Sequence, residues 1–335
     1  RVVAAGTTPA TEGVGVRTEH LAATEAVHGT LELLVSSLPA RALDLPPERS
    51  ELVRACAASG VAGPTPDGRT GDRVDSSHPY VHFDPDLCIS CGRCVRMCDE
   101  VQGTYALTLA GRGPDTVLVA GAGDRWIDSP CVGCGGCADA CPTGAIFEPG
   151  LHDPRPIETI TRTTCGYCGV GCSLDVQVRE DAVAARTPAL DGPVNRGHAC
   201  VKGRFAHAFA RSRDRLTSPL VRRDGRLQPA TWDEALGLVG QELRRIIAEH
   251  GPDAVAAISS ARATNEENYL LQKLMRAVVG TNNVDNCSRL CHAPSAAGLV
   301  AAFGLSGGTH SFDDLDRTDC ILLVGANPTE AHPVV

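Results

Sequence analysis

The sequence predicts a multidomain chain, α+β in its first part and α/β in its last, and three observations support this. A cysteine spacing occurs twice, 43 residues apart from Cys88 to Cys131, which indicates a small domain with an internal repeat. Alternating segments beside a third cysteine group predict a small β-rich domain. From Ser218 onward, apolar segments alternate with capped helices, as in a doubly wound parallel sheet.

Composition limits the classes of function. The 335 residues are 43% hydrophobic and 21% charged, enough for two or three domains with real cores. A net charge of -9 argues against a nucleic-acid partner, and no apolar stretch is long enough for a transmembrane segment. Sixteen cysteines, mostly in metal-type spacings, indicate a reducing compartment, so we expect a cytoplasmic protein. Because the chain starts at Arg1 and stops at Val335 after a glycine loop, we expect a fragment.

Residues 1–77 form the first predicted domain. We expect an amphipathic helix from Leu21 to Leu38, a short Ala-rich helix around Cys56 and a Gly/Pro/Asp loop from Gly60 to Asp75. Cys56 has no ligand partners nearby except His28, so a buried core position is favoured over a metal role.

Residues 78–150 carry the repeat, and each half contains C-x2-C-x2-C-x3-C. This spacing is typical of [4Fe-4S] clusters, and in two-cluster ferredoxins the fourth cysteine of each run serves the other cluster. We therefore assign one cluster to Cys88, Cys91, Cys94 and Cys141, and the other to Cys131, Cys134, Cys137 and Cys98. Each half should be a short hairpin plus a helix. Structural zinc and disulfides are the alternatives.

Residues 158–214, after a linker at 151–160, hold the third cysteine group. Three local cysteines and a distant one can hold a further [4Fe-4S] cluster, with zinc as the alternative: Cys165, Cys168, Cys172 and Cys200. The segments LDVQVRED and VAART predict strands. Lys202 follows Cys200 by two residues, where a cation could simply screen an anionic cluster.

Residues 215–335 begin the α/β domain. Capping boxes at Thr231–Glu234 and Thr264–Glu267 start two helices, and Gly251 and Gly280 end them. We expect their apolar stripes to face a core: Leu236, Val239, Leu243, Ile246 and Ile247 in the first, and Leu270, Leu271, Leu274, Met275 and Val278 in the second. Strands are predicted at Ala254–Ile258 and Cys320–Val324, and a third helix opens at Pro294.

Cys291 and His292 precede this third helix. A thiol near a helix N-terminus has a lowered pKa and can be a soft metal ligand, and an imidazole exchanges protons near neutral pH. The residues alone equally allow a structural cysteine beside a surface histidine.

Taken together, these motifs resemble a known family. TTCGYCGVGC with NRGHACVKG, and CSRLCHAPSAAGL, are similar to the cluster and active-site motifs of molybdopterin-dependent oxidoreductases, specifically the formate dehydrogenase group. The resemblance covers Thr161 to Val335. A weaker one, to the iron-sulfur extension of NAD-linked formate dehydrogenase large subunits, covers the residues before it, where a further His/Cys cluster of the family is absent.

The resemblance implies roles for particular residues. Cys291 would ligate molybdenum or tungsten, His292 would handle the proton, and Lys202 would bridge cluster and pterin. Cys287 matches no functional position. The contacts to molybdopterin guanine dinucleotide would come from Arg262, Gly325, Asn327 and Glu330.

The implied function is the catalytic subunit of a formate dehydrogenase, with formate oxidised to CO2 at a bis-molybdopterin guanine dinucleotide centre. Electrons would leave through three [4Fe-4S] clusters to a flavin- and NAD-binding diaphorase subunit. Two alternatives remain: another molybdopterin oxidoreductase such as a nitrate reductase, and a non-catalytic electron-transfer subunit like the large iron-sulfur subunit of NADH dehydrogenase.

Overall fold

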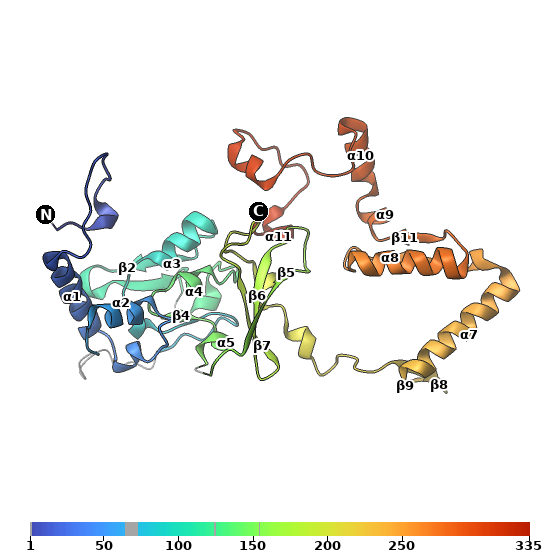
Figure 1. Cartoon of the computed structure of the whole chain (residues 1–335), viewed down its shortest axis with the longest axis horizontal. Coiled ribbons are helices and arrows are strands. Elements are labelled where there is room, and N and C mark those ends of the chain that lie inside the picture. The colour runs from blue at the N-terminus through green and yellow to red at the C-terminus, as the bar shows by residue number, and fades with distance from the viewer. Residues whose placement is uncertain (1, 64–72, 124, 154) are drawn as a thin grey trace. The chain divides into compact units, whose positions relative to one another are not determined.

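The structure is a computed structural model that describes residues 2–63, 73–123, 125–153 and 155–335. The loop predicted from Gly60 to Asp75 falls largely on residues 64–72, outside the described residues. The chain forms two compact units, which we describe separately (Figure 1). Unit 1 is Arg1–His207 with Pro328–Val335, and unit 2 is Ala208–Asn327.

The N-terminal region of unit 1 is helical, as predicted. It contains α1 (Leu21–Ser36) and α2 (Glu51–Ser59), and the Ser50 hydroxyl caps α2 by accepting the Val53 N–H at 3.2 Å. Cys56 is 2% exposed, in the same apolar core as Phe83 and Leu87 beside the first cysteine run. The predicted core position of Cys56 is therefore confirmed, and this region packs directly against the repeat.

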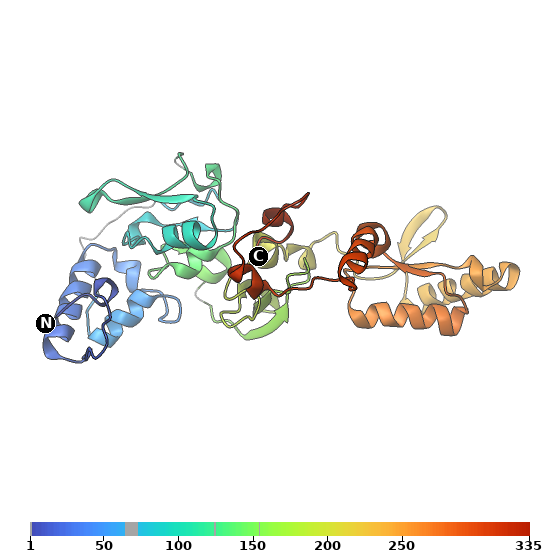
Figure 2. The same ribbon diagram turned by 90° about the horizontal axis from the view of Figure 1, so that it is seen from above.

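The repeat follows in unit 1 (Figures 1 and 2). Its elements are β1 (His82–Phe83), α3 (Arg93–Arg96) continued by a π-helical turn (Met97–Val101), β2 (Leu107–Ala110), β3 (Val117–Ala120), α4 (Gly136–Ala140), β4 (Ile146–Phe147) and α5 (Pro149–His152). Gly92 and Gly135, 43 residues apart, both adopt positive φ (70° and 76°) immediately before α3 and α4. The two ligand loops therefore share one backbone conformation.

The prediction of one hairpin in each half is wrong. The β2–β3 hairpin lies between the two cysteine runs, and Figure 2 shows it (teal) extending along one side of the α3 region. β1 instead pairs antiparallel with β4, so that His82 faces Phe147 and Phe83 faces Ile146. Two-residue strands at opposite ends of the repeat satisfy their backbone hydrogen bonds across the two halves, and this closes the domain.

The β-rich part of unit 1 is an antiparallel sheet in the order β5-β6-β7. Its strands are β5 (Thr159–Thr164), β6 (Ser173–Arg179) and β7 (Ala182–Pro188), and α6 (Val201–Phe205) follows. β6 and β7 confirm the predicted strands. The sequence does not predict β5, and the first residues of this strand fall in the predicted linker at 151–160. The reason is that all six residues of β5 are exposed, so no alternation of apolar and polar residues marks the strand.

Unit 2 contains the capped helices that were predicted. Its elements are β8 (Leu220–Arg223), β9 (Arg226–Pro229), α7 (Trp232–His250), β10 (Ala257–Ser259), α8 (Asn265–Lys273) continued by a π-helical turn (Leu274–Val279), β11 (Val284–Asn286), α9 (Ser288–Cys291) and α10 (Ala293–Phe303). β8 and β9 pair antiparallel, and β10 and β11 pair parallel. Thr264 and Glu267 form a reciprocal capping box at the start of α8. The helix α11 (Pro328–Ala331) belongs to unit 1.

Three predictions for unit 2 are wrong. Cys320–Val324 is not a strand, and its apolar side chains are exposed. The strand predicted at Ala254–Ile258 is present as β10, but it starts later, at Ala257, and it is not buried, since Ile258 is 79% exposed. Neither helical stripe forms a core: no residue of α7 is buried, and of the second stripe only Met275 is buried. The parallel sheet here has two strands, which offer too little surface to cover these apolar faces.

No helix in the described part of the chain combines the length and apolar character needed to cross a lipid bilayer.

Candidate functional site

Three small hollows in unit 1 are each lined by four cysteines. The sets are Cys88, Cys91, Cys94 and Cys141; Cys98, Cys131, Cys134 and Cys137; and Cys165, Cys168, Cys172 and Cys200. The first two sets exchange the last cysteine of each run, because α3 and α4 pack together and carry Cys98 and Cys141 towards the opposite loop. The structure therefore brings together the groupings that the spacing predicts.

Backbone amides point at cysteine sulfurs in both halves of the repeat. The N–H of Ser90 donates to Cys88 Sγ and the N–H of Gly133 to Cys131 Sγ, each at 3.4 Å and at equivalent repeat positions. The last cysteine of each run also accepts an amide, with N···Sγ distances of 3.2 Å from Ala106 to Cys98 and 3.4 Å from Ile146 to Cys141. Such donors stabilise the negative charge of cluster thiolates.

Burial shifts the titration of these thiols. It raises the pKa of Cys94 to about 12 and of Cys172 to about 11, and in both cases neighbouring cysteines of the same set add to the shift. Without a metal, Cys94 and Cys172 are thus protonated at neutral pH. Cluster binding must displace those protons, so it couples to pH.

The donor sets fit a multi-iron cluster. All sixteen cysteines are free thiols. Among the described residues, no three His, Cys, Asp or Glu side chains are placed to hold a single metal ion. Four sulfurs around a hollow, with amides directed at them, suit a four-iron cluster, whose ligands lie farther apart than those of one zinc ion.

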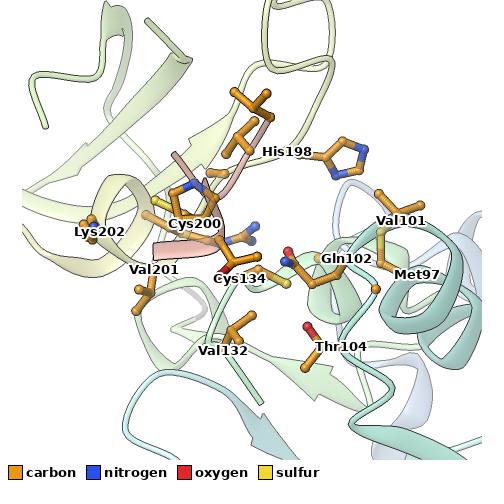
Figure 3. Close-up of a pocket in the computed structure, with 18 of the residues that line it drawn as sticks. Met97, Val101, Gln102, Thr104, Val132, Cys134, His198, Cys200, Val201 and Lys202 are labelled. Atoms are coloured by element: carbon orange, nitrogen blue, oxygen red, sulfur yellow. The ribbon is translucent and has the colours of Figure 1, made fainter. Parts of the chain in front are cut away.

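Lys202 lies beside the third cysteine set. It is the second residue of α6, which begins directly after Cys200, and its Nζ donates to the Glu330 carbonyl oxygen at 2.7 Å. Lys202 also lines a larger cavity of about 690 Å³ that is shared by Cys134 and Cys200 (Figure 3). Two different cysteine sets therefore face one space.

Cys291 and His292 are adjacent in unit 2. Cys291 ends α9 and His292 is the N-cap of α10, and Cys291 Sγ lies 3.1 Å from His292 Nε2. Both side chains are exposed. A thiolate at Cys291 is chemically suited to bind a soft metal.

Cys287 has a different environment from Cys291. Its Sγ accepts the Ala261 N–H at 3.1 Å, and its own N–H donates to the Ser259 carbonyl oxygen at 3.1 Å. Cys287 therefore ties the loop after β10 to the start of α9, which suits the structural role expected of it.

The predicted pterin contacts fall in both units. Arg262 follows β10, and its N–H donates to Ser260 Oγ at 3.1 Å. Gly325 has φ +61° and lies with Asn327 in unit 2, whereas Glu330 lies in unit 1 beside Lys202. Within unit 1, the structure thus joins Glu330 to Lys202.

The sequence does not identify two buried polar residues that lie beside the cysteine sets. Asn195 is 2% exposed and binds the Ser173 backbone through both side-chain atoms, and Arg204 is 1% exposed in α6. No spacing or periodicity marks either residue, because their partners are distant in sequence.

Comparison with known families defines the class of protein. Residues 215–335 match the family model described as "Molybdopterin oxidoreductase", residues 158–212 match "Molybdopterin oxidoreductase Fe4S4 domain", and residues 78–147 match "NADH-quinone oxidoreductase subunit 3, ferredoxin-like domain". The chain belongs to the molybdopterin oxidoreductases. The predicted fold class is confirmed: a ferredoxin-like domain, a [4Fe-4S] domain and the start of a molybdopterin-binding domain.

The chain also resembles individual proteins whose names are more specific than those of the family models. The chain is 37% identical over 301 residues to the "Probable oxidoreductase YjgC" of Bacillus subtilis (strain 168), a match that covers 78% of this chain and 31% of that protein. It is 36% identical over 297 residues to a protein of Staphylococcus aureus (strain USA300) named "Putative formate dehydrogenase", covering 77% of this chain and 30% of that one. The chain thus spans about a third of the length of these relatives.

Solved structures resemble it weakly. A chain of an NAD+-reducing [NiFe]-hydrogenase is 27% identical with a TM-score of 0.38, covering 45% of this chain and 65% of that one. Acetylene hydratase from Pelobacter acetylenicus is 21% identical with a TM-score of 0.36, covering 42% and 20%.

Proposed function

We propose that this chain is the amino-terminal part of the catalytic subunit of a formate dehydrogenase. The observation that carries the proposal is the Cys291–His292 pair, a soft ligand and a proton acceptor 3.1 Å apart, in a molybdopterin oxidoreductase whose relatives include proteins named for formate dehydrogenase. Neither residue has a packing role that would explain it, since both are exposed.

The chemistry divides between the two residues. Formate gives up two electrons and one proton and leaves as CO2. A molybdenum or tungsten ion held by two molybdopterin guanine dinucleotides supplies the two-electron acceptor when bound. Cys291 contributes one soft anionic ligand to it, and His292 takes the proton. Arg262, Gly325, Asn327 and Glu330 would contact one of the dinucleotides.

Electron exit uses the three cysteine sets as [4Fe-4S] clusters. Lys202, which lines the third hollow, would bridge a cluster held there and the pterin, and electrons would then pass to the two clusters of the repeat. The acceptor is a flavin- and NAD-binding diaphorase subunit, in the cytoplasm. We assign these roles to domains at 78–150, 158–214 and 215–335, preceded by a degenerate iron-sulfur extension at 1–77.

A non-catalytic electron-transfer subunit is the second candidate. The match of residues 78–147 to a ferredoxin-like domain of NADH-quinone oxidoreductase favours it. An electron-transfer subunit needs the clusters but not Cys291 and His292. The molybdenum or tungsten content of the protein therefore separates the two candidate functions.

The test uses the full-length protein, purified anaerobically. We expect about 12 iron atoms per chain, from three four-iron clusters, together with molybdenum or tungsten and guanine nucleotide. Formate should then reduce a viologen dye. Iron without molybdenum or tungsten would favour the electron-transfer subunit, and a bound pterin metal with no formate-dependent reduction would indicate a different molybdopterin oxidoreductase.

A further inference from the structure

Arg204 is a buried cation between the second and third cysteine sets. It lies on α6, four residues after Cys200, and its side chain is 1% exposed. Its Nη1 and Nη2 donate to the two carboxylate oxygens of Asp139 at 2.5 and 2.6 Å, and its Nε donates to Glu148. The ion-paired residues thus come from two domains: Arg204 from the third cluster domain, and both acids from the repeat.

The guanidinium also lies against a ligand loop. Gly135, between Cys134 and Cys137, has φ +76°, and a Cβ added there would lie 2.5 Å from Arg204 Nε. The backbone between these two cysteines therefore approaches the guanidinium directly. Asp139 lies between Cys137 and Cys141. Arg204 therefore contacts the segment that carries the cysteine ligands twice, at Gly135 and at Asp139.

Two further residues of α6 make contacts in the same direction. A Cβ at Gly133 would lie 3.2 Å from Val201 Cγ2, which shows that α6 packs closely on the loop after Cys131. The Phe205 ring stacks on Tyr80 with centroids 4.6 Å apart and an interplanar angle of 6°. Val201 and Arg204 therefore pack α6 on the second ligand loop, and Phe205 packs its last turn on Tyr80, elsewhere in the repeat.

We propose that Arg204, through its buried bidentate pairing with Asp139 and its contact with Glu148, is a positioning residue that fixes the third cysteine set relative to the second. This deepens the proposed function, since it rests on both sets holding clusters. The step it serves is the passage of one electron, in which one cluster is oxidised, the next is reduced and no bond changes. A planar fork is needed for the bidentate geometry, which a lysine ammonium cannot reproduce.

The test measures the magnetic interaction between reduced clusters by electron paramagnetic resonance, in the full-length protein. The variants are Arg204→Lys and Arg204→Met. The matched control is Arg162→Met, which removes a half-exposed arginine on β5 that pairs with Asp175 and Asp191 within the same domain. Iron content is measured on every sample.

We expect the wild type and Arg162→Met to show interaction between the second and third clusters, and both Arg204 variants to lose it while keeping their iron. The proposal would be overturned if Arg204→Met kept the magnetic interaction, or if Arg204→Lys showed it. In either case the relative position of the two cysteine sets would not depend on the planar guanidinium. A wild type with full iron and no interaction would also overturn the proposal. If Arg204→Met does not fold, Glu148→Gln, which keeps an acceptor of the same shape, should still weaken the interaction, and no change there would also count against the proposal.

A wild type without iron would instead contradict the proposed function itself. The two failures are therefore distinguishable.

Discussion

The smallest unit of the proposed chemistry is a pair of neighbouring side chains with different tasks. Cys291 can bind a soft metal through its sulfur, and the His292 imidazole can accept a proton. Their atoms lie 3.1 Å apart, and the turn from α9 into α10 exposes both. Since neither is buried, replacing either should leave the fold intact and change chemistry alone.

This separation gives a prediction at the residue scale. In the full-length enzyme, Cys291→Ser should abolish formate oxidation, because a hydroxyl is a harder and far less acidic ligand. His292→Ala should keep its metal and lose turnover by about 10² to 10⁴-fold, as for a lost general base. Formate-dependent dye reduction measures both, with Cys287→Ser as the control that keeps activity. Wild-type rates in both active-site variants would make the pair structural.

At the scale of elements, the third cysteine set depends on a loop held by one amide. Asn195 is buried, and its Oδ1 accepts the Ser173 N–H at 2.8 Å. Its Nδ2 donates to the carbonyl oxygens of Ser173 and His198 at 3.1 and 2.7 Å. Ser173 begins β6 beside Cys172, and His198 precedes Cys200 by two residues. One side chain therefore joins the two segments that must bring their cysteines together.

Replacing Asn195 should consequently weaken the whole loop. Asn195→Ala leaves the partly buried Ser173 N–H and two carbonyl groups without this partner, and an unsatisfied buried group costs about 1–3 kcal/mol. We expect lower thermal stability and faster loss of cluster absorbance. Gln177→Ala on β6, which removes a single bond to Thr187, is the milder control. Equal stability of the two variants would show that Asn195 does not hold the loop.

On the scale of the whole molecule, the repeat works only as a pair of halves. Each half contributes three cysteines to one hollow and its last cysteine to the other, and β1 completes its pairing with β4 of the opposite half. Neither cluster site can therefore form from one half alone.

Double variants test this exchange. Cys88→Ser with Cys141→Ser should remove one cluster and leave about eight of about 12 irons, because both ligands serve the same set. Cys131→Ser with Cys141→Ser should remove two clusters and leave about four. Iron analysis decides, and Cys56→Ser, which alters a core cysteine outside all three sets, should keep every iron atom. The reverse order of losses would mean that each run closes its own cluster.

Features set within a few residues could be predicted from the sequence. The spacing from Cys88 to Cys98 determines a ligand turn, and the capping box at Thr264 determines where α8 begins, because the interacting groups are at most ten positions apart. The Cys291–His292 pair could be predicted for the same reason, because its two residues are adjacent in the chain.

The features that only the tertiary structure reveals depend on residues that are far apart in the sequence. Arg204 meets Glu148 across 56 residues, β1 pairs with β4 across the repeat, and β5 is a strand because β6 lies beside it, without apolar alternation of its own. The opposite error occurred at Cys320–Val324, where an apolar run predicts a strand but no neighbouring strand lies beside it in the described chain. A strand or a buried ion pair is stable only when a partner satisfies it, and a local pattern cannot specify that partner.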